Sequence, residues 1–225
     1  MKLQHLRFLP AAIALCGDAQ ATVVSITNGN FEAQTPTDGG AIQFITSWFE
    51  STSSGYQDWL FRSTNNNVIA GNSSTLLGFS STGGYVYQQI GSYTVGEQVT
   101  VSGDAFKRGL AASSQFSGFK IELLAGNFTG ADGTALVATL LGSQDFTATD
   151  LGLPTSGTTS ASSPFSVTFD SGSSGVEGSA LWVRLSKLGT SGEIFLDNLA
   201  AVPEPSALLL GAIGLVPLMV RRRES

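Results

Sequence analysis

The sequence predicts an all-β fold, an antiparallel β-sandwich, on three observations. Apolar and polar residues alternate over short runs, most cleanly at 165–169 and 181–185, which is the period of a half-buried strand. Turn-forming Gly, Ser, Thr and Asn separate these runs. Long stretches with the 3.6-residue period of a helix are missing, as is any alternation of strands with helices, so a parallel sheet is not indicated.

About a dozen runs fit short strands: 23–26, 41–49, 56–62, 68–70, 76–79, 85–90, 99–106, 119–123, 135–141, 165–169, 181–185 and 194–199. The Gly83-Gly84 pair predicts a turn that joins 76–79 to 85–90 as a hairpin. Residues 144–164, which are rich in Thr, Ser and Gly, are interpreted as a long polar connection.

The first 21 residues have the pattern of a signal peptide. Lys2 and Arg7 precede an apolar segment at 8–17, and Ala19 and Ala21 form an A-x-A cleavage site. We therefore expect an N-terminal signal helix, cleavage by signal peptidase and a mature chain that begins at residue 22. Lipidation of Cys16 is an alternative, although Leu15 stands where a small residue is expected.

Removal of this segment narrows the available chemistry. The one cysteine, Cys16, and the one histidine, His5, both lie in it, so the remaining chain has no thiol or imidazole. Ser–His–Asp and Cys–His catalysis and zinc sites built from His and Cys are then excluded. A carboxylate pair of the glycosidase kind remains available, but no spacing singles one out. We expect a protein that is not an enzyme and that requires no cofactor.

Charge argues against nucleic acid as a partner. Residues 22–202 contain six basic and fourteen acidic residues, a net charge of −8. So few cations cannot neutralise a phosphate backbone.

The C-terminus joins three segments without a gap: Pro203-Glu204-Pro205, an apolar run at 207–220, and Arg221-Arg222-Arg223. As a helix at ~1.5 Å per residue the apolar run reaches roughly 21 Å. That is short of the ~30 Å hydrocarbon core of a bilayer. The positive-inside rule keeps the arginines in the cytoplasm and leaves everything before Pro203 outside.

This tail resembles the PEP-CTERM sorting signal of Gram-negative bacteria. The resemblance implies recognition by an exosortase, with Pro203, Glu204 and Pro205 as the sorting motif and Arg221, Arg222 and Arg223 as the basic cluster. It divides the chain into a signal peptide at 1–21, a β-sandwich at 22–200 and a sorting signal at 201–225. It also implies transient anchoring in the inner membrane by a short hydrophobic helix, followed by display at the cell surface or in the extracellular matrix. An ordinary C-terminal membrane anchor is the alternative.

The segments 28–32 and 194–199 resemble the first and last strands of jelly-roll carbohydrate-binding modules. That resemblance implies a jelly-roll sandwich whose first and last strands meet, often around a structural calcium ion, for which Glu32 and Asp197 would supply carboxylates. Calcium takes six to eight oxygen ligands, so other groups would have to complete the shell. Alternatively, Glu32 makes a hydrogen bond in a turn and Asp197 lies at a solvated sheet edge.

Aromatic and polar side chains indicate a glycan-binding function, because sugar rings stack on aromatic faces beside hydrogen-bonding groups. The candidate residues are Trp48, Tyr56, Asp58, Trp59, Tyr85 and Tyr87. Aromatic residues in strands are also common in cores, which is the alternative for each. The hypothesis is an exported protein that contacts exopolysaccharide. Its rivals are a purely structural or adhesive matrix protein and a small glycoside hydrolase.

Overall fold

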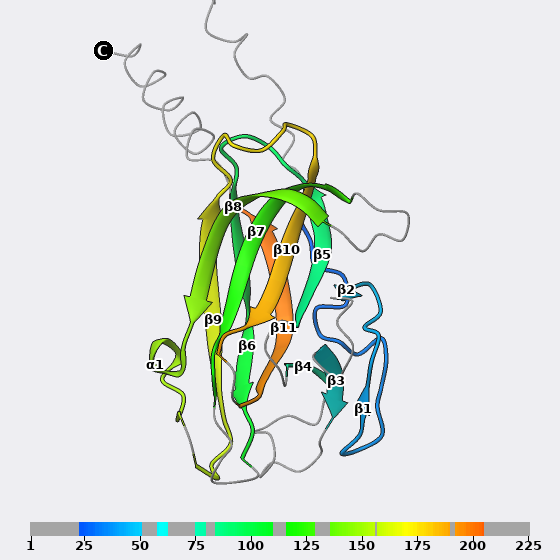
Figure 1. Ribbon diagram of the computed structural model, residues 1–225, viewed down its shortest axis with the longest axis vertical. Coiled ribbons are helices and arrows are strands. Elements are labelled where there is room, and N and C mark those ends of the chain that lie inside the picture. Colours follow the sequence, from blue (N-terminus) through cyan, green and yellow to red (C-terminus); the bar gives the residue numbers. More distant parts are fainter. Residues whose placement is uncertain are drawn as a thin grey trace, which may run out of the picture.

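The computed structural model describes residues 23–50, 58–62, 75–79, 84–109, 116–128, 136–155, 157–189 and 192–204. In these residues the chain forms two antiparallel sheets packed face to face, which confirms the predicted β-sandwich (Figure 1). The signal segment, the apolar tail with its arginines and the expected strand at 68–70 lie outside the described residues. No helix among the described residues is long and apolar enough to cross a membrane.

The two sheets contain eleven strands among the described residues. The six-stranded sheet has the order β1 (Ala41–Ile42), β3 (Asp58–Arg62), β4 (Thr75–Phe79), β11 (Ile194–Pro203), β6 (Gln98–Lys107) and β9 (Ala161–Asp170). The five-stranded sheet has the order β2 (Phe49–Glu50), β5 (Tyr85–Ser92), β10 (Ala180–Lys187), β7 (Phe119–Phe128) and β8 (Leu136–Phe146). One short helix, α1 (Ala148–Leu151), connects β8 to β9.

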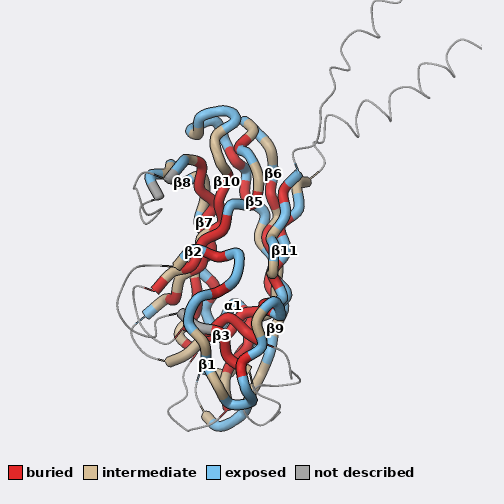
Figure 2. Tube along the Cα trace, turned by 90° about the vertical axis from the view of Figure 1, so that its right-hand side faces the viewer, coloured by how far each residue is buried: buried red, intermediate tan, exposed pale blue. Residues whose placement is uncertain are grey.

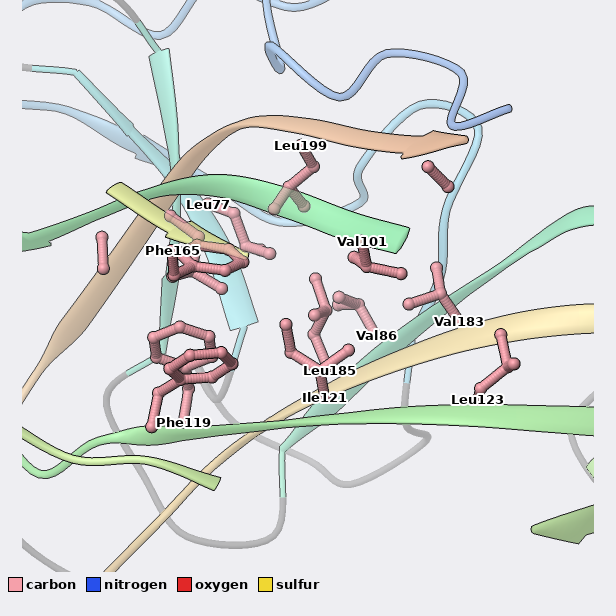
Figure 3. Packing of buried hydrophobic residues seen from close by; sticks show 14 of the residues in the cluster. Leu77, Val86, Val101, Phe119, Ile121, Leu123, Phe165, Val183, Leu185 and Leu199 are labelled. Carbon is pink, nitrogen blue, oxygen red and sulfur yellow. The ribbon is translucent and has the colours of Figure 1, made fainter. Parts of the chain in front are cut away.

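The core lies between the sheets, where every second residue of each long strand points inward. Figure 2 shows the sheets as two layers with buried residues along both. Side chains from both sheets meet in this layer (Figure 3). The following of them have no exposed surface: Leu77, Val86, Val101, Phe119, Ile121, Leu123, Val183 and Leu185. Burial of this apolar surface is the main term that stabilises the fold, as expected for a chain without disulfides.

The predicted hairpin around Gly84 is wrong. β4 belongs to the six-stranded sheet and β5 to the five-stranded sheet, so the chain crosses from one layer to the other between them. Glycines indicate that the chain turns, but they do not determine which strands pair.

The interpretation of 144–164 as a polar connection is also wrong. β8 continues to Phe146, Thr147 caps α1 in a capping box with Asp150, and β9 begins at Ala161. Lys107 binds the segment between α1 and β9. Its Nζ donates to the carbonyl oxygens of residues 157 and 159 at 2.7 and 3.1 Å.

The structure also differs from the expected strands at both ends of the sandwich. Residues 23–26 form no strand, although Ser25 N donates to Ile90 O at 2.8 Å. The expected strand at 41–49 is reduced to the two-residue strands β1 and β2. At the other end β11 runs to Pro203, so the sandwich extends three residues beyond the expected boundary at 200.

Candidate functional site

The outer face of the five-stranded sheet, which is the face turned away from the six-stranded sheet, carries a row of aromatic and charged residues. Strand register aligns Phe49, Tyr87, Arg184, Glu122 and Ser143 across β2, β5, β10, β7 and β8. Opposed residues of antiparallel strands project on the same side of a sheet. We call these five residues the cross-strand row. It spans all five strands, and Figure 1 shows the sheet that carries it in front of β6 and β11.

Aromatic rings gather at the β2 end of the row. Phe49 stacks on Tyr87 with ring centroids 5.5 Å apart and an interplanar angle of 14°. Tyr87 also contacts Tyr85 at 5.8 Å and the edge of Trp182 at 6.1 Å. Phe49 is 46% exposed although it belongs to this cluster. An exposed ring supported by buried rings offers a rigid apolar surface to a ligand.

Ion pairs occupy the middle of the same face. Arg184 Nε donates to Glu122 Oε2 at 2.6 Å, and the guanidinium carbon lies 5.5 Å from the centre of the Tyr85 ring. The hydrogen bond to Glu122 raises the pKa of Arg184 above its usual value. Lys120 Nζ lies 3.7 Å from Asp145 Oδ1 in the neighbouring row. Each of these two cations is therefore partnered by a carboxylate, and the face has little net charge.

Strand alternation explains how the chain builds this face. Leu181, Val183 and Leu185 of β10 point into the core, which leaves Trp182 and Arg184 on the outer face. The Trp182 ring is 3% exposed, and its Nε1 donates to the carbonyl of Gly126 at 2.9 Å. Trp182 is absent from the set of candidates expected from sequence. Its position, out of phase with the core residues of β10, is the signal that could have identified it.

Burial also affects the chemistry of Tyr87. Burial removes water from around the phenol, and this is the larger cause that raises the pKa of Tyr87. The electrostatic effect of the nearby Tyr85 is the smaller cause and acts in the same direction. A phenol is protonated at neutral pH even at its ordinary pKa, and this shift extends the protonated range further, so Tyr87 is able both to donate and to accept a hydrogen bond.

Of the candidates for glycan binding, Tyr85 and Tyr87 lie on the outer face. Trp48 does not: it is 7% exposed in the core, packs against Phe31 and donates from Nε1 to Asn28 O at 3.4 Å. The prediction that Trp48 binds glycan is therefore corrected. The opening loop, residues 28–31, packs against the Trp48 ring and buries it.

The remaining candidates do not join this face in the described residues. Tyr56 lies outside them. Asp58 and Trp59 are residues of β3, which belongs to the six-stranded sheet. The set expected from sequence is therefore divided between the two sheets.

The opening loop and the last strand meet, as the jelly-roll resemblance implies. Leu199 N donates to Gly29 O at 2.9 Å. Glu32 Oε1 accepts from Thr75 N at 2.8 Å, and Asp197, which is 2% exposed, accepts from Asn198 N at 2.7 Å. No group of three His, Cys, Asp or Glu residues that could hold a metal occurs among the described residues. Calcium binding by Glu32 and Asp197 stays a prediction. Comparison of the melting temperature of the protein with calcium and with a chelator tests it.

No protein-family model and no curated protein matches the sequence. Solved structures share the fold. A Stig cyclase from Fischerella sp. TAU, in complex with an indole compound, has a TM-score of 0.60 at 17% identity and covers 82% of this chain and 98% of its own. A putative sugar binding protein from Bacteroides thetaiotaomicron VPI-5482 has a TM-score of 0.51 at 9% identity and covers 81% of this chain and 100% of its own.

The cyclases correct the expectation that this chain is not an enzyme. That expectation rested on the lack of histidine and cysteine after residue 21 and on the absence of an evident carboxylate pair. The Fischerella cyclases are enzymes, and 98% of their own length aligns with this chain. A sandwich of this fold and size is therefore compatible with catalysis. At 17% identity the likeness shows the fold alone, and no catalytic role passes to residues of this chain.

Proposed function

We propose that the outer face of the five-stranded sheet binds polysaccharide, and that the chain is exported and sorted to the cell surface or matrix where it meets that ligand. The cross-strand row carries the proposal. Its exposed Phe49 and the neighbouring half-buried Tyr85 offer stacking surfaces, while half-buried Arg184 and exposed Ser143 offer hydrogen-bonding groups on either side of the buried Glu122. Apolar surface with a few aligned polar groups is the usual composition of a sugar site.

The dimensions of the row favour a polymer over a single sugar. Five strands at ~4.8 Å spacing place its ends roughly 19 Å apart. Both cations described above are paired with carboxylates, and residues 22–202 carry a net charge of −8. An anionic polymer would meet no unpaired cation from Arg184 or Lys120, so the proposed ligand is a neutral polysaccharide. The shared fold of a putative sugar binding protein supports the proposal.

A panel of neutral and anionic polysaccharides tests the binding. The purified chain is expected to be retarded in gels that contain neutral polymers, with little dependence on salt, because charge pairing contributes little to the attraction. The double variant Phe49→Ala, Tyr85→Ala is expected to lose the retardation. Equal retardation of the variant, or retardation only by anionic polymers, would contradict the proposal. No retardation by any polymer would favour a structural matrix protein.

Sorting has a separate test. The motif at Pro203-Glu204-Pro205 followed by the apolar run and the arginines supports processing by an exosortase, after signal peptidase has cut at residue 21. The intact mass of the protein recovered from its own cells is expected to match a chain from residue 22 to a terminus near 202–205. A chain that keeps residues 207–223 in the membrane fraction would instead show a permanent anchor.

A further inference from the structure

The last strand carries the start of the sorting motif into the sheet. β11 ends at Pro203, which is paired with Val99 of β6. Glu204 continues this pairing, because its backbone N–H donates to Gln98 O at 2.8 Å. Two residues of the motif are therefore part of the folded sandwich, with no linker between the last strand and the motif.

The side chain of Thr100 holds the Glu204 carboxylate, and Thr168 in turn contacts Thr100. Thr100 Oγ1 of β6 lies 2.6 Å from Glu204 Oε1 and 2.6 Å from Thr168 Oγ1 of β9. A carboxylate accepts hydrogen bonds, so the Thr100 hydroxyl donates to Glu204 and the Thr168 hydroxyl donates to Thr100. The result is a hydrogen-bond chain across three adjacent strands, whose last link is the stronger kind made to a charged acceptor.

Glu204 holds the end of β11 at a point where packing is weak. Because its amide bonds to Gln98 O, the neighbouring Pro203 stands at a position whose N–H would point away from β6, so the proline fits there without loss of a bond to that strand. Val202 is 49% exposed and adds little packing. Strand ends with few buried contacts open at low free-energy cost. The two hydrogen bonds of Glu204 oppose that opening at the point where the motif begins.

We propose that the sandwich masks its own sorting motif, and that the end of β11 must open before a processing enzyme can bind Glu204. The inference rests on the sorting proposed above. In the closed state the Glu204 amide and the Oε1 atom of its carboxylate are both bonded to β6, so an enzyme that binds Glu204 must first displace these two contacts. The rate of processing then depends on the fraction of chains in which this strand end is open. We call the contact between Thr100 and Glu204 the latch.

The variant Thr100→Val removes the hydroxyl and keeps the shape of the side chain. Hydrogen exchange of the Glu204 amide, measured on the uncleaved full chain from a host without exosortase, is expected to become about tenfold faster in this variant, as for the loss of a hydrogen bond to a charged group. In the native host, the half-time of tail removal is expected to shorten in parallel. Thr168→Val, which removes only the second link, is expected to show a smaller change in both measurements.

Thr139→Val is the matched control, because Thr139 is an exposed threonine of β8 in the other sheet. It should change neither rate. An unprotected Glu204 amide in the wild-type chain would overturn the latch. Faster exchange in Thr100→Val with an unchanged processing half-time would overturn the masking. If the Glu204 amide is protected from exchange but the tail is never removed in the native host, the sorting proposal is contradicted. Masking of a processing site is then contradicted as well.

Discussion

Replacing Phe119 with alanine is expected to lower the free energy of unfolding by roughly 3–5 kcal/mol, the range for truncating a buried phenylalanine. Phe119 has no exposed surface. Its ring lies 5.1 Å from that of Phe146 and 4.9 Å from that of Phe165. Because Phe165 is on β9 and Phe119 on β7, the truncation opens a cavity between the two sheets, at a place where neighbouring strands cannot easily collapse to fill it.

Urea unfolding of the purified chain measures this effect. Phe119→Leu retains most of the volume and is expected to lose less stability than Phe119→Ala. Phe44→Ala removes a ring that is 77% exposed and is expected to change the free energy by no more than about 0.5 kcal/mol. A loss below about 1 kcal/mol for Phe119→Ala would contradict the packing of Phe119 between the sheets, since it would resemble that of an ordinary exposed position.

Replacing Gly29 with alanine is expected to separate the opening loop from the last strand and to destabilise the protein by about 3 kcal/mol, at the upper end for overpacking. A Cβ atom at this position would lie within van der Waals overlap of the backbone oxygen of Leu199. Backbone cannot move aside as a flexible side chain can, so the loop must shift. The shift would also break the hydrogen bond from Leu199 N to Gly29 O.

Hydrogen exchange of the Leu199 amide reports directly on this contact and should accelerate in Gly29→Ala. Gly39→Ala provides the control. Gly39 has φ +73°, but a methyl group added there would have no atom within 4 Å, so this variant tests backbone strain without a clash. That strain is expected to cost about 1–2 kcal/mol. Equal exchange at Leu199 in wild type and Gly29→Ala would show that the loop does not depend on this close approach.

The sandwich could be predicted because some of its strands bury every second residue. At 165–169 and 181–185 apolar residues recur at every second position, and the structure extends these runs into strands of ten and eight residues. The sequence underestimates the length of β8 because this is the last strand of its sheet and its second half is largely exposed and polar. β9 is likewise an edge strand, which explains how it accommodates Pro164.

The candidate site could be predicted only in part, because a sequence shows that residues alternate but not which strands are neighbours. Tyr85 can be found from its aromatic character. The cross-strand row depends on the order β2-β5-β10-β7-β8, which joins Phe49 to Glu122 across more than seventy residues of chain. The burial of Trp48 escapes prediction for the same reason, since the loop that covers it contacts β11 at the far end of the sequence.

Calorimetric titration with the neutral polysaccharide of the native host's own matrix tests the central claim most directly, through the matched pair Phe49→Ala and Phe44→Ala. Both variants remove one exposed phenylalanine ring, but only Phe49 belongs to the cross-strand row. We expect Phe44→Ala to bind as the wild type does, and Phe49→Ala to bind about tenfold more weakly, as for the loss of one stacked ring. Equal dissociation constants for the two variants would show that the outer face of the five-stranded sheet is not the binding surface.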